Sequence, residues 1–274
     1  MVRTHTRRVM GVAAAIALAA SLIVQAPAHA LTAKKTTSNG VNTCTVTYSD
    51  AERKEYDDTL TKFATVFTDW LIRNGSSFGV SVDSSRRSYL IATIRNGFSD
   101  VSVTSEDYTN AQVRNTVMKD MLPLYSDDKT YEELLDAMKN QMTNDGTAVP
   151  AQLVEIFQNM PSKLGISKAT AAATVAIFGQ NAMSITGSTL TNQQRFEILN
   201  SLTSVEANAT AEMLLMGWQL AYQIVDKCSS ALGTNNDDVK ATAASAITAL
   251  GGTPRTTSED RKSGSSFLGS SLSS

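Results

Sequence analysis

The stretch from Ser49 to Gly75, SDAERKEYDDTLTKFATVFTDWLIRNG, decides the fold class. Ser49 and Glu52 have the spacing of a capping box, in which two side chains cap the first turn of a helix reciprocally. Apolar residues then recur at the helical spacing of three and four: Tyr56, Leu60, Phe63, Phe67, Trp70 and Leu71. The stretch therefore predicts an amphipathic helix that ends near Gly75.

Similar helix signals recur along the rest of the chain. They predict helices around residues 89–96, 105–122, 128–142, 150–160, 169–185, 192–202, 205–232 and 237–250. We predict that Thr104 or Ser105 caps the second of these helices and that Pro161 stops the fourth. The sequence thus indicates an all-α bundle of about eight or nine helices without a sheet.

The helix predicted at residues 205–232 has a centre, Met213 to Val225 (MLLMGWQLAYQIV), that contains no charged residue. Apolar side chains lie all round this segment, as expected for a helix enclosed by others. We therefore predict that it is the central, buried helix of the fold.

The first thirty residues, MVRTHTRRVMGVAAAIALAASLIVQAPAHA, have the three regions of a secretory signal. Arginines precede an uncharged run, and Ala28-His29-Ala30 forms a small-x-small cleavage site, so the mature chain is expected to begin near Leu31. The pair Arg7-Arg8 leaves both the general secretory and the twin-arginine routes open. We expect a secreted or cell-envelope protein of bacterial type.

Residues 31–250 are long enough for one helical domain with a substantial core. The last 24 residues, 251–274, contain eight serines and four glycines and are predicted to be a disordered tail. The sequence thus predicts a cleaved signal, a single domain and a tail.

Cleavage of the signal removes His5 and His29, the two histidines of the chain. It also removes three of the 24 Lys and Arg but none of the 26 Asp and Glu, which leaves a formal charge of −5. This acidity favours solubility and argues against binding nucleic acid. With no histidine and no spare cysteine, we predict no metal site and no cofactor.

Cys44 and Cys228 are the two cysteines of the chain, and an exported protein can keep them as a disulfide. The alternative is two separate buried thiols. We predict the disulfide, which would join the start of the domain to its central helix.

The segment Gly75-x-Ser77-x-Gly79 has the spacing of the nucleophile elbow of serine hydrolases. Such an elbow follows a strand and needs a histidine as general base. Here a predicted helix precedes it and both histidines are removed, so we interpret it as the turn after that helix, with Gly75 at positive φ. No catalytic residue is assigned.

Glycoside hydrolysis is the enzyme class with most room, because it needs only two carboxylates. Glu155, Glu197 and Glu212 lie on predicted helices beside apolar positions and would be the first candidates. A cell-wall glycosidase is therefore the main alternative function.

Two uncharged segments, residues 169–194 and 213–225, suggest a third function as a lipid carrier or membrane-interacting protein. The candidate residues for an apolar groove are Phe178, Met183, Met213, Met216 and Trp218. Core packing explains the same residues more simply.

The sequence favours a non-catalytic, exported protein that binds a protein, an envelope polymer or a lipid. This hypothesis rests on the signal segment and on the fact that no motif in the sequence has a complete set of catalytic residues.

Overall fold

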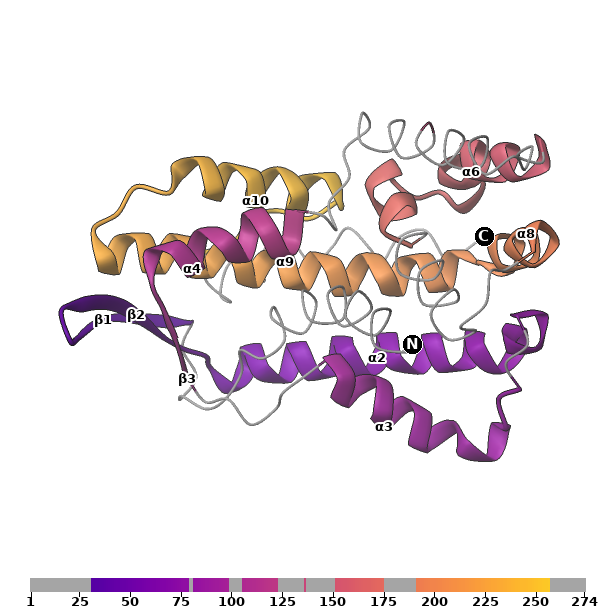
Figure 1. Ribbon diagram of the computed structural model, residues 1–274, viewed down its shortest axis with the longest axis horizontal. Helices are drawn as coiled ribbons and strands as arrows, with labels where there is room; N and C mark the ends of the chain where they lie inside the picture. Colours follow the sequence, from indigo (N-terminus) through magenta and orange to yellow (C-terminus); the bar gives the residue numbers. More distant parts are fainter. Residues whose placement is uncertain are drawn as a thin grey trace, which may run out of the picture. The chain divides into compact units, whose positions relative to one another are not determined.

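The computed structural model describes residues 31–78, 81–98, 105–122, 136, 151–174 and 191–256 (Figure 1). The predicted signal segment, most of the helix predicted at 128–142 and the tail beyond residue 256 lie outside these residues. The chain divides into two compact units. The first unit contains the described residues of 59–98 and 122–214, and the second contains those of 31–58, 105–121 and 215–256. The single domain at 31–250 stays a prediction.

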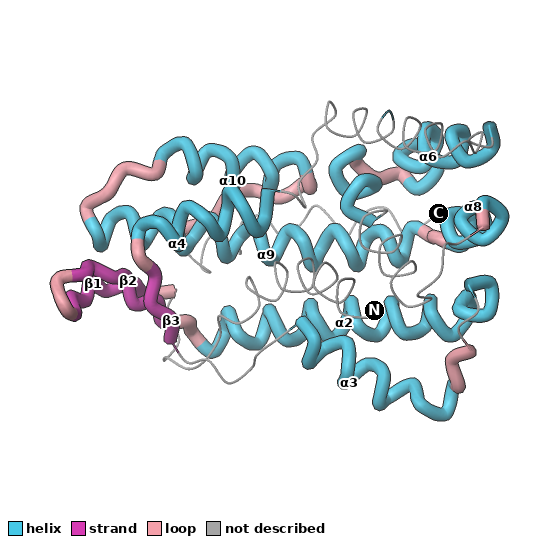
Figure 2. The backbone as a smooth tube through the Cα atoms, in the orientation of Figure 1, coloured by secondary structure: helices cyan, strands magenta, loops and turns pink. Residues whose placement is uncertain are grey.

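The second unit contains a three-stranded antiparallel sheet, drawn in magenta in Figure 2. Its strands β1 (Thr32–Ser38), β2 (Val41–Thr47) and β3 (Ser105–Tyr108) lie in the order β1-β2-β3. The fold is therefore mostly helical but not purely α, and the expectation of no sheet was wrong.

A two-residue turn at Asn39-Gly40 explains the hairpin of β1 and β2. The φ angles are 52° at Asn39 and 76° at Gly40. Two-residue hairpin turns of type I′ need positive φ at both positions, and Asn-Gly is the pair that adopts them most readily. The flanking runs are rich in threonine and valine, which favour strands. Local turn chemistry therefore overrides the polar character of this segment.

The helix predicted from residue 105 begins later, because Ser105–Tyr108 pairs with β2. Helix α4 (Asn110–Asn115) is capped by Thr109, whose side chain accepts from the backbone N–H of Gln112. It continues as the π-helix Thr116–Met121. The proposed caps Thr104 and Ser105 were wrong, and Thr109 with Gln112 forms the capping box.

Two helices complete the second unit, the part of α9 (Ser204–Leu232) from residue 215 onward and α10 (Asp237–Ala249). They run side by side in Figure 1. Just after α10, Gly252 packs so closely against α9 that an added Cβ would lie 2.4 Å from Cδ1 of Leu215. The buried hydrophobic residues of α9 in this unit are Trp218, Leu220, Ala221, Ile224, Val225 and Cys228. The long helix was predicted, and these side chains confirm that its centre is largely buried.

Helix α2 (Asp50–Asn74) matches the predicted first helix. The Ser49 backbone N–H donates to Oε2 of Glu52 at 3.0 Å, and the Glu52 N–H donates to Oγ of Ser49 at 3.2 Å. The capping box is therefore confirmed. At its other end, α2 continues into the 3₁₀ helix Gly75–Phe78, and Gly75 does not have the positive φ expected.

The first unit contains α2 from residue 59 onward, a 3₁₀ turn (Ser84–Arg86) and the helices α3 (Arg87–Phe98), α6 (Ala151–Leu164) and α8 (Asn192–Ser201). The predicted capping box of Thr191 and Gln194 precedes α8 and is confirmed. Of the helix predicted at 169–185, residues 168–174 are helical, and the rest lies outside the described residues.

Helix α6 passes through Pro161 instead of stopping before it. The helix ends one turn later, where Gly165 has a φ of 65° and the Ile166 N–H donates to the Pro161 carbonyl. Phe157 and Met160 are buried just before the proline. Their packing offsets the roughly 3 kcal/mol that a proline inside a helix costs.

Candidate functional site

Cys44 and Cys228 form the predicted disulfide, with an S–S distance of 2.00 Å and a Cα–Cα distance of 5.5 Å. Both residues belong to the second unit and are fully buried. The bond joins strand β2 to helix α9 across 184 positions of the sequence. It therefore fixes the sheet of this unit to its longest helix.

The candidate apolar groove is not assembled by the described residues. Met213 is buried in the first unit and Trp218 in the second, and Met216 is half-buried on the same helix. Phe178 and Met183 lie outside the described residues. None of the helices in the described ranges is long and apolar enough to cross a membrane.

The three glutamates considered for glycoside hydrolysis lie on three different helices. Glu155 is exposed on α6, and Glu197 on α8 accepts a hydrogen bond of 3.1 Å from Nε2 of Gln193. Glu212 on α9 pairs with Lys62 at 2.6 Å. Glu197 and Glu212 thus each interact with a different neighbouring side chain.

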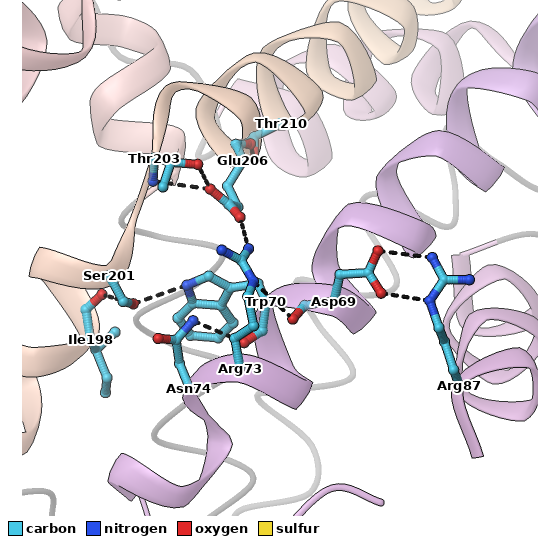
Figure 3. Close-up of polar contacts among 10 residues, drawn as sticks. All are labelled: Asp69, Trp70, Arg73, Asn74, Arg87, Ile198, Ser201, Thr203, Glu206 and Thr210. Atoms are coloured by element: carbon cyan, nitrogen blue, oxygen red, sulfur yellow. Dashed lines mark hydrogen bonds and ion pairs between the residues drawn. The ribbon is translucent and has the colours of Figure 1, made fainter. Parts of the chain in front are cut away.

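A different glutamate, Glu206, forms the most buried carboxylate of the first unit among the described residues, with 1% of its surface exposed. Oε2 accepts from the backbone N–H of Thr203 at 3.0 Å and from the Thr203 hydroxyl, and Oε1 pairs with Arg73. Figure 3 shows the carboxylate held between these two partners. Glu206 therefore caps the start of α9 and attaches it to α2.

Trp70 and Asp69, next to each other on α2, extend this network (Figure 3). The buried Trp70 indole donates to Oγ of Ser201 at 3.0 Å, which attaches α2 to the end of α8. Asp69 forms a two-pronged pair with Arg87 at 2.6 and 2.8 Å, which attaches the start of α3. The pKa of Asp69 lies below its ordinary value, mainly because Arg87 donates hydrogen bonds to this carboxylate.

The polar network of Figure 3 joins four helices of the first unit, and its buried carboxylate already has partners at both oxygens. A general acid or base needs an oxygen that can reach a substrate. Glu206 is therefore best explained as a structural carboxylate. The spacing of Thr203 and Glu206 is that of a capping box, so the sequence carried a signal for the cap although not for Arg73.

The sheet of the second unit presents an outward face lined by hydroxyl groups, which we call the hydroxyl face. Side chains alternate between the two sides of a strand, and Cys44, Val46 and Tyr108 are buried on the inner side. The register places the following residues together on the outer side: Thr32, Lys34, Thr36, Ser38, Val41, Thr43, Thr45, Thr47, Ser105 and Asp107. All of them are exposed or half-buried.

Hydrogen bonds connect the hydroxyls in the middle of this face across all three strands. Thr36 lies 2.6 Å from Thr43 and 3.3 Å from Thr45 between Oγ1 atoms, and Thr45 donates to Asp107 at 2.6 Å. Each hydroxyl has one proton and two lone pairs. Because Thr45 gives its proton to Asp107, Thr36 donates to Thr45 and Thr43 donates to Thr36, which leaves lone pairs to accept from a ligand. The centre of the face therefore offers a row of fixed hydrogen-bond acceptors. Sequence reasoning missed it because it missed the sheet.

Beneath the sheet, Glu106 accepts a hydrogen bond of 3.0 Å from the hydroxyl of Tyr108, close to the buried Tyr48. Partial burial raises the pKa of the Glu106 carboxyl above its ordinary value, although the Tyr108 hydrogen bond opposes this. Burial also raises the pKa of Tyr108, so its hydroxyl keeps the proton that it donates.

Replacing Glu106 with glutamine is expected to raise the thermal midpoint at pH 7 and to leave it nearly unchanged at pH 4. The folded chain holds the Glu106 proton more tightly than the unfolded chain, so stability falls as pH rises above the ordinary pKa of 4.5. Glutamine can still accept from Tyr108 and carries no charge to desolvate. Thermal unfolding at both pH values tests this, and a lower midpoint at pH 7 would contradict it.

Comparison of the chain with protein-family models, with curated proteins and with solved structures found no match.

Proposed function

We propose that the chain is an exported, non-catalytic protein that binds an uncharged polysaccharide of the cell envelope through its hydroxyl face. Export is supported by the signal-like segment before Leu31 and by the Cys44–Cys228 disulfide, since disulfides persist mainly in oxidising compartments. The hydroxyl face is the single observation that carries the choice of ligand.

The chemistry of the hydroxyl face fits a polymer of sugars better than the other partners considered. Its one lysine and one aspartate, Lys34 and Asp107, cancel in charge, which favours an uncharged ligand. Protein interfaces have aromatic or apolar centres and lipids need apolar surface, whereas Val41 is the one apolar side chain on this face.

The geometry of a sheet also suits a repeating ligand. Neighbouring side chains on one face lie about 6.7 Å apart along a strand and about 4.8 Å apart between strands. A polysaccharide likewise presents hydroxyls at regular intervals, so several hydrogen bonds can form in parallel. Each such bond contributes about 1 kcal/mol, and useful affinity therefore requires several threonines together.

Co-sedimentation with insoluble bacterial cell-wall polysaccharide and with cellulose tests this proposal. We expect the chain starting at Leu31 to pellet with at least one of them. A triple variant with Thr36→Val, Thr43→Val and Thr45→Val keeps the shape of the side chains and should bind about tenfold or more weakly, since three hydrogen bonds are lost.

Thr37→Val is the matched control, because Thr37 is exposed on the same hairpin but points to the opposite side of the sheet. It should bind like the unaltered chain. Equal binding by the triple variant, or no sedimentation with either polymer, would contradict the proposal. Release of soluble sugar from the wall material would favour the glycosidase alternative instead.

A further inference from the structure

The backbone nitrogen of Leu31 lies at the point where the signal segment is predicted to be cut. In the structure this nitrogen donates a hydrogen bond of 3.0 Å to Oε1 of Glu52. Both residues are buried, with 2% of Leu31 and 5% of Glu52 exposed, and both belong to the second unit. The predicted cleavage position therefore touches a buried carboxylate.

The other oxygen of Glu52 is engaged by neutral groups only. Oε2 accepts from the backbone N–H and from the hydroxyl of Ser49, each at 3.0 Å. Among the described residues, no lysine or arginine side chain forms an ion pair with Glu52. A buried carboxylate without a cation is unfavourable, because hydrogen bonds replace only part of its lost hydration.

Cleavage would supply the missing cation. Hydrolysis of the Ala30–Leu31 bond consumes one water and leaves a carboxylate on Ala30 and an amino group on Leu31. We propose that this new α-ammonium group of Leu31 is the cationic partner of Glu52, so that removal of the signal segment completes the fold of the second unit. The inference rests on the export part of the proposed function.

Before cleavage, the same nitrogen is a neutral amide with one N–H, and Glu52 remains without a cation. After cleavage it carries a positive charge and three donors at the position that already lies 3.0 Å from the carboxylate. The precursor is therefore less stable than the mature chain. Such a difference would keep the chain easier to unfold until export is complete.

Four purified chains test this inference without requiring export or polymer binding. Two begin at Leu31 and two begin at Ala28, which moves the terminal charge away while keeping natural residues; one of each pair carries Glu52→Gln. We expect the Ala28 start to lower the thermal midpoint by about 5 °C when Glu52 is present. With Glu52→Gln, the two starts should differ by less than about 1 °C.

Equal midpoints for the two starts with Glu52 present would overturn the inference. So would an undiminished difference in the Glu52→Gln pair, because the extension would then act through its bulk. If Glu52→Gln does not fold, the rate at which the α-amino group is acylated at neutral pH tests the pairing instead. The Leu31 amine should react about tenfold more slowly than the Ala28 amine, and equal rates would refute the pairing.

The outcomes also separate this inference from the proposed function. Loss of polysaccharide binding leaves the four-chain comparison unaffected, because that comparison measures stability alone. Sequencing the amino terminus of the protein from its native source tests the biological role directly. We expect Leu31, and any other starting residue would overturn the pairing in the native protein.

Discussion

Replacing both Cys44 and Cys228 with alanine is expected to lower the free energy of unfolding by about 3 to 5 kcal/mol. The bond links residues 184 positions apart, so it restricts the unfolded chain strongly. The chain-entropy model gives about 5 kcal/mol for a loop of this length, and residual structure in the unfolded chain reduces that figure. Denaturation in urea measures the change.

Reduction provides the control for the cysteine prediction. A reducing agent should lower the stability of the unaltered chain toward that of the double variant and leave the variant unchanged. Because both cysteines are fully buried, reduction is expected only when the chain is allowed to unfold. A double variant within about 1 kcal/mol of the unaltered chain would contradict the structural role of the bond.

Glu206→Ala is expected to lower the free energy of unfolding by about 2 to 3 kcal/mol, through loss of a helix cap and of a hydrogen bond to a charged group. The side chain of Arg73 is 53% exposed, so it can be rehydrated when its partner is removed. Solvent screening therefore limits how much the ion pair with Arg73 contributes to the free energy of unfolding. Glu206→Gln should cost less, because glutamine can still complete the capping box.

Glu212→Ala is the matched control for Glu206→Ala. Glu212 lies on the same helix and also pairs with a cation from α2, Lys62, but its side chain is 34% exposed and caps nothing. Exposed pairs of this kind contribute about 0 to 1 kcal/mol. Urea denaturation of both variants gives the comparison, and equal losses would show that the buried cap has no special role.

Most helices could be predicted because their signals are local. The capping boxes at Ser49 and Thr191, together with the apolar spacing that follows, indicate where α2 and α8 begin. The hairpin was equally local, since Asn39-Gly40 between threonine-rich runs is a strong turn signal. Hydrophobic periodicity, which predicts the helices, does not reveal it because both of its strands are rich in polar residues.

Strand β3 and the end of α6 depend on contacts that the local sequence does not encode. Ser105–Tyr108 is only four residues long, and it is a strand because it pairs with β2. Pro161 remains inside α6, where buried neighbours hold the helix. Long-range packing decides both cases, so local propensity alone gave the wrong boundary.

Functional residues depend on more than local sequence signals. The disulfide followed from two cysteines in a chain with a predicted signal segment. Met213 and Trp218, considered for a groove, are buried in the first and the second unit respectively. Uncharged helices predict burial and do not reveal which side chains remain open to a ligand. The hydroxyl face can be identified only once the sheet register is known, and the Leu31–Glu52 contact only once the folded backbone is known.

The intact mass of the protein purified from its native source, measured in denaturant before and after reduction, tests export and the disulfide together. We expect the mass of a chain that begins at Leu31, increased on reduction by the two hydrogens that convert a disulfide into two thiols. A chain that still begins at Met1, or a mass that reduction does not change, would contradict an exported, disulfide-bonded binding protein.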